Sequence, residues 1–368
     1  MSTILFYNFI LLSSTFFVWL SEKMLYKLDR CLVIGVAFFL VFLPAAIRYD
    51  IGTDYLNYLE IYESGSYIDY KLKEPAFYFI NWFLDSIGAH FQWLFVVFSF
   101  IFTAVAFKAY PRKNVWLLHF LFFSMLWYFS FNGIRQAMAL SWCLLALFQF
   151  FDRKYVFFIV LTLIASTFHQ SALIFTLVGI ACMVPLNDRI KTYLAPLVFI
   201  GFIAFTFVAM NVVLTYMEQI LQLLGLTKYA GYFNSAKHFI ARDFGSGIGV
   251  LAKILFSCYV IFNAKNFIEI NKQYWFLIVL VFAYAVATVL ANNIIIFGRM
   301  ADVFILAPIA SSYLLLQLPK NRQVHKLVLA CFIAFLLLSF IKEGFGVATS
   351  YADPKRNPYQ TIFEVKIE

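Results

Sequence analysis

Residues 48–58, RYDIGTDYLNY, bring an arginine, two aspartates, three tyrosines and an asparagine together directly after an apolar run over residues 31–47. An arginine at a membrane boundary can simply anchor a helix, but Asp50 and Asp54 close behind Arg48 favour a polar site. A guanidinium is always charged, and its planar fork of donors matches phosphate oxygens. The stretch therefore predicts an anion-binding site flanked by carboxylates.

Three further polar breaks interrupt long apolar runs, and chain length explains why they must be hairpin tips. Residues 115–151 would form a helix of roughly 55 Å, too long for one crossing of a membrane core of about 30 Å. The chain must turn near residues 132–136, NGIRQ, and by the same reasoning near residues 167–171, TFHQS. A third tip covers residues 292–299. Arg135 opens a helix, where free backbone N–H groups also favour an anion.

The 48–58 stretch, these tips and the outer segment predicted at 218–247 supply the candidate site residues. The candidate diphosphate ligands are Arg48, Arg135, Arg299 and Arg242. The candidate proton-transfer groups are His169, which titrates near neutrality, and Asp54. The candidate sugar-binding residues are Asp50, Tyr55, Asn57, Gln136 and Gln170.

Each candidate also has a purely structural interpretation. Arg48 can mark the end of its span, Asp302 can neutralise Arg299 one helical turn away, and Arg242 can be a solvated loop residue. Aspartate after Gly-Thr is ordinary turn chemistry, and His169 can bind backbone at its turn. No P-loop, HExxH, GxSxG, GxGxxG or cysteine-metal motif occurs, so the sequence predicts neither a metal nor a cofactor.

Composition decides which scaffold must position these residues. The chain has 63% hydrophobic, 21% aromatic and 13% charged residues, with 47 phenylalanines. Such values, with recurrent apolar runs of 14 to 25 residues, predict an all-α polytopic membrane protein. The five cysteines lie inside apolar runs and have no metal-ligand spacing, so they are interpreted as core residues.

We predict about twelve transmembrane helices, with no cleavable signal because basic residues follow the first run instead of preceding it. Their approximate bounds are 3–20, 31–47, 91–108, 115–131, 136–151, 155–168, 170–187, 193–217, 248–264, 273–291, 300–318 and 327–342. Every short loop then predicted inside carries at least two Lys or Arg residues. The net charge of +9 is therefore a topology signal and does not indicate a nucleic-acid partner.

This topology places Arg48, Arg135, His169 and Arg299 on the outer side. Two larger extracytoplasmic segments, residues 48–90 and 218–247, accompany them, and residues 343–368 form an extracytoplasmic tail. Residues 75–89 are apolar but short, which indicates an interfacial or re-entrant helix. Without internal repeats or a separable soluble part, residues 1–368 are expected to form a single integral membrane domain.

Five short motifs in a fixed order resemble the EpsG-like branch of the Wzy polysaccharide polymerases. They are RYDIGTDYLNY, NGIRQAMALSW at 132–142, FHQSALI at 168–174, the Gly298-Arg299 pair and Pro358-Tyr359. On this resemblance, Arg48, Asp50, Gly52, Asp54 and Tyr55 fall on the first motif. Arg135 and Gln136 fall on the second, His169 and Ser171 on the third, and Arg299 on the fourth.

The resemblance implies a GT-C-like helical bundle with an extracytoplasmic cavity, in the bacterial inner (plasma) membrane. The implied activity transfers a growing glycan from undecaprenyl diphosphate to the terminal sugar of a lipid-linked repeat unit, without a cofactor. The expected partners are undecaprenyl-diphosphate-linked oligosaccharide and the lipid bilayer, with a chain-length-regulating membrane protein as an additional candidate. Arginines at the leaving diphosphate and a base at the acceptor hydroxyl predict an inverting single displacement.

Two alternatives remain open on the sequence alone. An O-antigen ligase would use the same donor but pass the glycan to lipopolysaccharide core, and it should have a larger external domain. A flippase or transporter for lipid-linked sugars should carry midplane charges and internal repeats. The predicted span interiors are nearly free of charge.

Overall fold

The computed structural model describes most of the chain as α-helices joined by short loops. Among the described residues there is no β-strand, only one isolated antiparallel bridge between Arg48 and Thr361. The predicted all-α fold is confirmed for this part of the chain. The description leaves out residues 1, 112, 185, 188–190, 193–195, 199, 203–215, 217–218, 220–221, 224–246, 292–294, 347–354 and 365–368.

Within the described residues, four helices are long and apolar enough to cross a membrane. They are α1 (Thr3–Ser21), α2 (Lys27–Ile47), α8 (Ile134–Phe151) and α18 (Arg322–Gly344). A fifth span results if α13 (Ile248–Phe262) and α14 (Ala264–Ile270), which meet at a 55° bend, are one broken crossing. The chain is therefore a membrane protein with several candidate spans.

Six shorter apolar helices of 10–17 residues coincide with other predicted spans. They are α5 (Gln92–Lys108), α6 (Val115–Leu126), α9 (Tyr155–Phe168), α10 (Ala172–Met183), α15 (Tyr274–Leu290) and α17 (Leu306–Leu315). The predicted span 115–131 is divided into α6 and the short α7 (Phe129–Asn132). The span predicted over 300–318 is likewise divided into α16 (Ile295–Val303) and α17. The predicted span 193–217 lies mostly outside the described residues.

The chain divides into two compact units. The first comprises Met1–Thr176 with Leu329–Glu368, and the second comprises Leu177–Val328. Arg48, Arg135 and His169 all belong to the first unit, whereas Arg299 belongs to the second. The single-domain organisation and the outer-side placement of the larger segments stay predictions.

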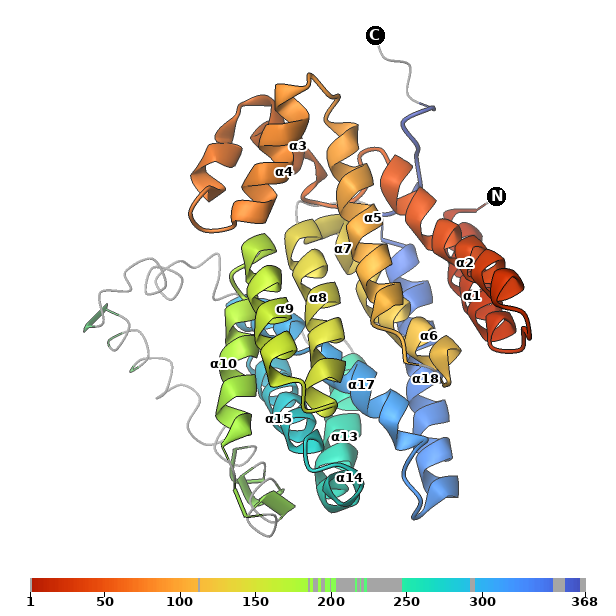
Figure 1. Cartoon of the computed structure of the whole chain (residues 1–368), viewed down its shortest axis with the longest axis vertical. Helices are drawn as coiled ribbons and strands as arrows, with labels where there is room; N and C mark the ends of the chain where they lie inside the picture. Colours follow the sequence, from red (N-terminus) through yellow and green to blue (C-terminus); the bar gives the residue numbers. More distant parts are fainter. Residues whose placement is uncertain are drawn as a thin grey trace. The chain divides into compact units, whose positions relative to one another are not determined.

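In the first unit, each helix packs against its neighbours in a simple series. Helix α1 packs on α2 and α6, α2 on α5, α5 on α8, and α8 on α9 (Figure 1). On α1, Leu5, Phe9, Leu12 and Phe16 are each more than half exposed. Their spacing places them on one helix face, which suits lipid contact.

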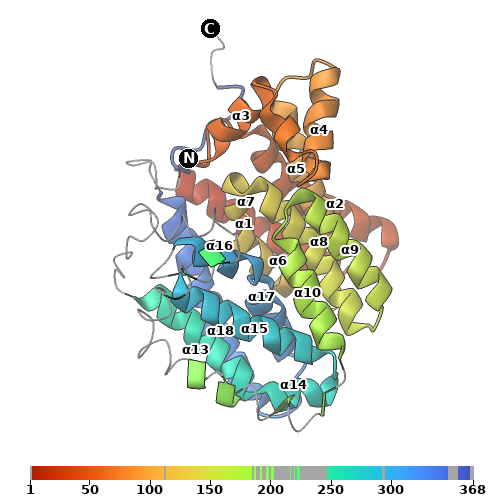
Figure 2. The same ribbon diagram turned by 90° about the vertical axis from the view of Figure 1, so that its left-hand side faces the viewer.

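The segment between α2 and α5 folds into three short helices near the end of α9. These are α3 (Tyr55–Glu63), the 3-10 helix η1 (Ser66–Tyr70) and α4 (Pro75–Ser86). Pro75 suits the first position of α4, because proline lacks the N–H that would be unsatisfied there. Helix α4 contacts η1, α5 and α9 (Figures 1 and 2). The short helix predicted at 75–89 is therefore present, and its relation to the membrane stays a prediction.

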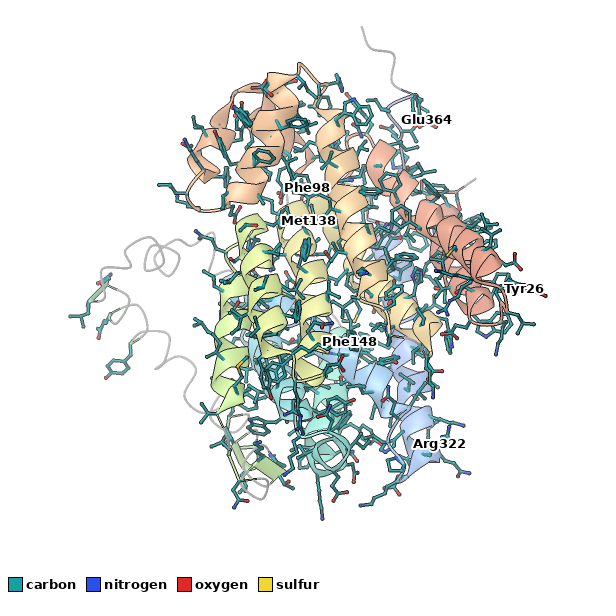
Figure 3. The ribbon with its side chains drawn as sticks, viewed as in Figure 1. Tyr26, Phe98, Met138, Phe148, Arg322 and Glu364 are labelled. Carbon is teal, nitrogen blue, oxygen red and sulfur yellow. The ribbon has the colours of Figure 1, made fainter. Side chains whose placement is uncertain are left out.

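The C-terminal segment of the first unit lies along the residues that follow α2. The N–H groups of Tyr49 and Ile362 donate to the carbonyls of Gln360 at 2.9 Å and Ile47 at 3.0 Å. The Tyr359 hydroxyl donates to the Pro44 carbonyl at 2.9 Å. Figure 3 shows Glu364 at the end of the α1–α2 hairpin away from Tyr26. We call residues 355–364 the tail strap.

The second unit is organised around α15, which packs on α13, α14, α16 and α17 (Figure 2). The Lys320 ammonium donates to the Glu269 carboxylate at 3.0 Å. The Tyr259 hydroxyl and His325 Nδ1 are 2.6 Å apart. The first contact joins α14 to the loop before α18, and the second joins α13 to α18.

Candidate functional site

Arg48 follows the last residue of α2 and is almost completely buried, with 1% of its surface exposed. Its guanidinium lies between the rings of Phe95 and Phe131, at 4.6 Å and 5.0 Å from their centroids. One nitrogen donates to the Ala45 carbonyl, while Nε and Nη2 have no hydrogen-bond partner. Burial lowers the pKa of Arg48 to about 10, so the side chain stays charged at neutral pH.

The backbone around Arg48 is fixed by Gln92 and by the tail strap. The Gln92 amide nitrogen donates to the Ala46 carbonyl at 2.6 Å and to the Arg48 carbonyl at 3.1 Å. The Gln92 amide oxygen accepts from the Tyr55 hydroxyl at 3.3 Å. Tyr55 is buried, and its ring stacks on Phe95 at 4.7 Å. Arg48 is thus held in place from several directions.

Gly52 brings the first motif into contact with the second. Its φ of +99° belongs to a region that glycine adopts readily, and its N–H donates to the Lys355 carbonyl at 2.7 Å. A Cβ at this position would lie 2.6 Å from both the Phe131 carbonyl oxygen and Asn132 Oδ1. The neighbouring Thr53 N–H donates to Asn132 Oδ1 at 2.9 Å. Only a residue without a side chain permits this approach.

Arg135, in the first turn of α8, forms the second cationic centre. Its guanidinium pairs with the Glu74 carboxylate and lies over the rings of Tyr70 at 4.6 Å, Phe77 at 5.0 Å and Tyr58 at 6.0 Å. The Arg135 side chain is 21% exposed, whereas that of Glu74 is 7% exposed. Unlike Arg48, Arg135 is therefore accessible from outside the protein.

Tyr58 connects Arg135 with a second carboxylate. Burial raises the pKa of Tyr58, the nearby Arg135 lowers it, and the charges of Asp54 and Glu74 raise it further. All three charged groups therefore lie close enough to Tyr58 to act on it electrostatically. Asp54 precedes α3, and its Oδ1 accepts from the Asn57 amide at 3.3 Å.

The turn after α9 reaches the same place through Glu74. The Gln170 N–H donates to Glu74 Oε1 at 3.4 Å, while Glu74 Oε2 accepts from Arg135. Glu74 thus joins the second motif to the third. We call Arg135, Glu74, Tyr58, Tyr70, Phe77 and the Gln170 backbone the Arg135 site.

His169 is half-buried in this turn, and its local hydrogen bonds determine its tautomer. The Ser171 N–H donates to His169 Nδ1 at 3.3 Å, and the Ser171 hydroxyl lies 2.7 Å from the same nitrogen. Because Nδ1 accepts, the proton of a neutral imidazole lies on Nε2. In this tautomer His169 presents a donor, so accepting a proton would require the local hydrogen bonds to rearrange.

The remaining predicted residues are distributed differently. Asp50 has a positive φ of 51° and pairs with Lys355 of the tail strap. Gln136 is buried and Gln170 is exposed. Arg299 is exposed on α16 of the second unit, and Arg242 lies outside the described residues. The structure therefore joins Arg135 to the His169 turn through Glu74, with Asp54 one helical turn before Tyr58, and the sugar-binding and diphosphate assignments stay predictions.

Sequence reasoning missed three residues that organise these centres: Glu74, Gln92 and Lys355. Glu74 directly precedes the short helix predicted at 75–89 and was assigned no role. A carboxylate inside a mostly aromatic segment was the one available signal, because a buried charge needs a partner. No group of three or more His, Cys, Asp or Glu side chains that could hold a metal ion occurs in the part of the chain that the structure describes.

Comparisons with known proteins give one match. Neither the curated proteins nor the solved structures include a match to this chain. The model of the EpsG family matches residues 31–361, a range that includes all five motifs and both arginine centres. Because the match covers most of the sequence, the chain belongs to the EpsG family.

Proposed function

We propose that this chain is a membrane glycosyltransferase that polymerises undecaprenyl-diphosphate-linked oligosaccharide repeat units into a surface polysaccharide. Its EpsG family membership supports a polymerase-like role in polysaccharide synthesis. The observation that carries the proposal is the Arg135 site. There an accessible guanidinium meets the turn of the third motif through one shared carboxylate. Charge, aromatic rings and accessible polar groups in one place suit a glycan attached to a diphosphate.

Arg135 binds the diphosphate of the donor in this proposal. Negative charge grows on the diphosphate as the glycosidic bond breaks, and a fixed guanidinium stabilises that charge. Arg299 and Arg242 are further candidate ligands. Arg48 is 1% exposed and its guanidinium lies against the Phe95 and Phe131 rings, so its unpartnered Nε and Nη2 can meet a phosphate only if the structure around it moves. Arg135 needs no such movement, and we rank it first.

The acceptor hydroxyl loses its proton to a protein group as its oxygen attacks the anomeric carbon. The bond from that carbon to the diphosphate breaks, and its electron pair leaves with the diphosphate. Asp54 is our first candidate for the proton acceptor, since its carboxylate needs no tautomer change and it lies one helical turn before Tyr58, whose N–H donates to the Asp54 carbonyl. His169, with its proton on Nε2, is better suited to donate to a sugar or phosphate oxygen.

The overall architecture and the membrane location are also proposed from membership of the EpsG family. About twelve spans would form a GT-C-like bundle in the bacterial inner membrane, with the Arg135 site facing an extracytoplasmic cavity. The half-buried Tyr70 ring beside the guanidinium would contact a sugar face. Asp50, Tyr55, Asn57, Gln136 and Gln170 remain candidates for binding sugar hydroxyls. A chain-length-regulating membrane protein is a candidate partner.

The proposal is tested by reconstituting the purified protein in liposomes with a purified lipid-linked repeat unit. We expect a ladder of products that differ by one repeat, each new linkage having an anomeric configuration opposite to that of the donor. Single transfer to a lipopolysaccharide core acceptor without a ladder would indicate a ligase. Retained configuration would contradict the single displacement.

A further inference from the structure

Glu74 forms an ion pair that helix capping does not explain. The residue stands immediately before α4, but its side chain makes no capping hydrogen bond to that helix. Instead it extends to α8 and to the turn after α9, where its two oxygens accept from Arg135 and from the Gln170 N–H. A buried carboxylate therefore occupies Nη1 of the guanidinium, one of the donors that would bind a diphosphate.

We propose that Glu74 is a resident competing anion, which occupies Arg135 in the ligand-free protein and weakens the binding of diphosphate there. This inference rests on the proposed function. Diphosphate oxygens and the Glu74 carboxylate require the same guanidinium donors, and their negative charges repel each other. Glu74 thus lowers the affinity of Arg135 for the lipid diphosphate that remains after transfer.

Weaker binding of the diphosphate makes release of the lipid diphosphate product faster. A site that holds a diphosphate tightly after the reaction gains nothing in turnover, because only interactions that strengthen in the transition state increase the rate. Glu74 also accepts from the Gln170 N–H, a contact that does not use the guanidinium, so it would stay next to Arg135 and pair with it again. Glu74 is accordingly a positioning residue that sets affinity.

The test measures binding of undecaprenyl diphosphate to the purified full-length protein. We expect Glu74→Gln to lower the Kd at least about tenfold, since an adjacent unit charge in a partly buried site exceeds one tenfold step. We also expect a lower KM for the lipid-linked donor together with a lower kcat, as release becomes slower. Glu63→Gln removes the same charge from an exposed position on α3 and should leave all three values unchanged.

A double-mutant comparison isolates the contact. In an Arg135→Ala background, Glu74→Gln should tighten binding by a much smaller factor than in the wild type, because the competition for the guanidinium is gone and only charge repulsion remains. If Glu74→Gln does not accumulate, Glu74→Asp keeps the charge on a shorter side chain and should tighten binding by a smaller factor.

The failure of this inference differs from the failure of the proposed function. A wild-type protein that neither binds the lipid diphosphate nor forms a ladder would overturn both. A wild-type protein that does both, with a Glu74 variant that binds no tighter, would overturn the competing-anion inference alone.

Discussion

Replacing Arg135 by alanine is expected to reduce the rate of ladder formation at least about 100-fold, the usual loss when one fixed donor to a developing anion is removed. Among the residues that the structure describes, this guanidinium is accessible and is joined to the third motif through Glu74. The measurement is the rate of repeat addition in liposomes at equal protein amounts. Arg30→Ala, an exposed residue at the start of α2, is the matched control and should keep the wild-type rate.

Stability must be separated from chemistry in this experiment. Arg135→Ala leaves the buried Glu74 carboxylate without its cation, and breaking a buried pair costs about 3–5 kcal/mol. The double variant Arg135→Ala/Glu74→Gln removes both charges, so it should accumulate better while remaining equally slow. A full ladder at a near-normal rate from either variant would remove Arg135 from the diphosphate assignment.

Gly52→Ala is expected to prevent most of the protein from folding. A methyl group would meet the Phe131 carbonyl and Asn132 Oδ1, both at 2.6 Å, and the φ of +99° adds backbone strain of about 1–3 kcal/mol. The first motif would have to separate from the second, which also removes the Thr53 to Asn132 hydrogen bond. A total of several kcal/mol is a large part of the roughly 5–15 kcal/mol that stabilises a folded protein.

Gly65→Ala provides the matched control for this substitution. Gly65 also has a positive φ, +71°, but no atom lies within 4 Å of a Cβ built there. We expect Gly65→Ala to lower the free energy of unfolding by only about 1 kcal/mol. Size-exclusion chromatography in detergent measures how much of each variant folds, and the melting temperature measures its stability. Equal behaviour of the two alanine variants would show that close approach of residues 52 and 131–132 does not determine stability.

Hydrophobic runs were sufficient to predict most helices of this fold. The run at residues 155–168 became α9 with the same bounds, and the run from residue 3 became α1. The break between α6 and α7 was missed, because the residues at the break, Trp127 and Tyr128, are as apolar as their neighbours. Both are buried and contact Phe340 of α18, so tertiary packing determines the break.

The candidate site was predictable in its residue types but not in its pairings. Length arguments placed Arg135 and His169 at hairpin tips, and the structure joins their turns. The group that joins them, Glu74, is 61 residues from Arg135 in sequence, and no local pattern indicates so distant a partner. Asp50 pairs with Lys355, 305 residues away, and its sugar-binding assignment stays a prediction. Such contacts depend on the packed fold.

The side of the membrane that the Arg135 site faces is the most direct test of the whole account. Leu72, close to Glu74, is 95% exposed, and Leu25, in the predicted inner loop, is 94% exposed. A membrane-impermeant thiol reagent on intact spheroplasts should modify Leu72→Cys but not Leu25→Cys until the membrane is permeabilised. Labelling of the wild-type protein, which has five native cysteines, is subtracted as background. Modification of Leu25→Cys alone would place Arg135 on the cytosolic side and contradict extracytoplasmic polymerisation.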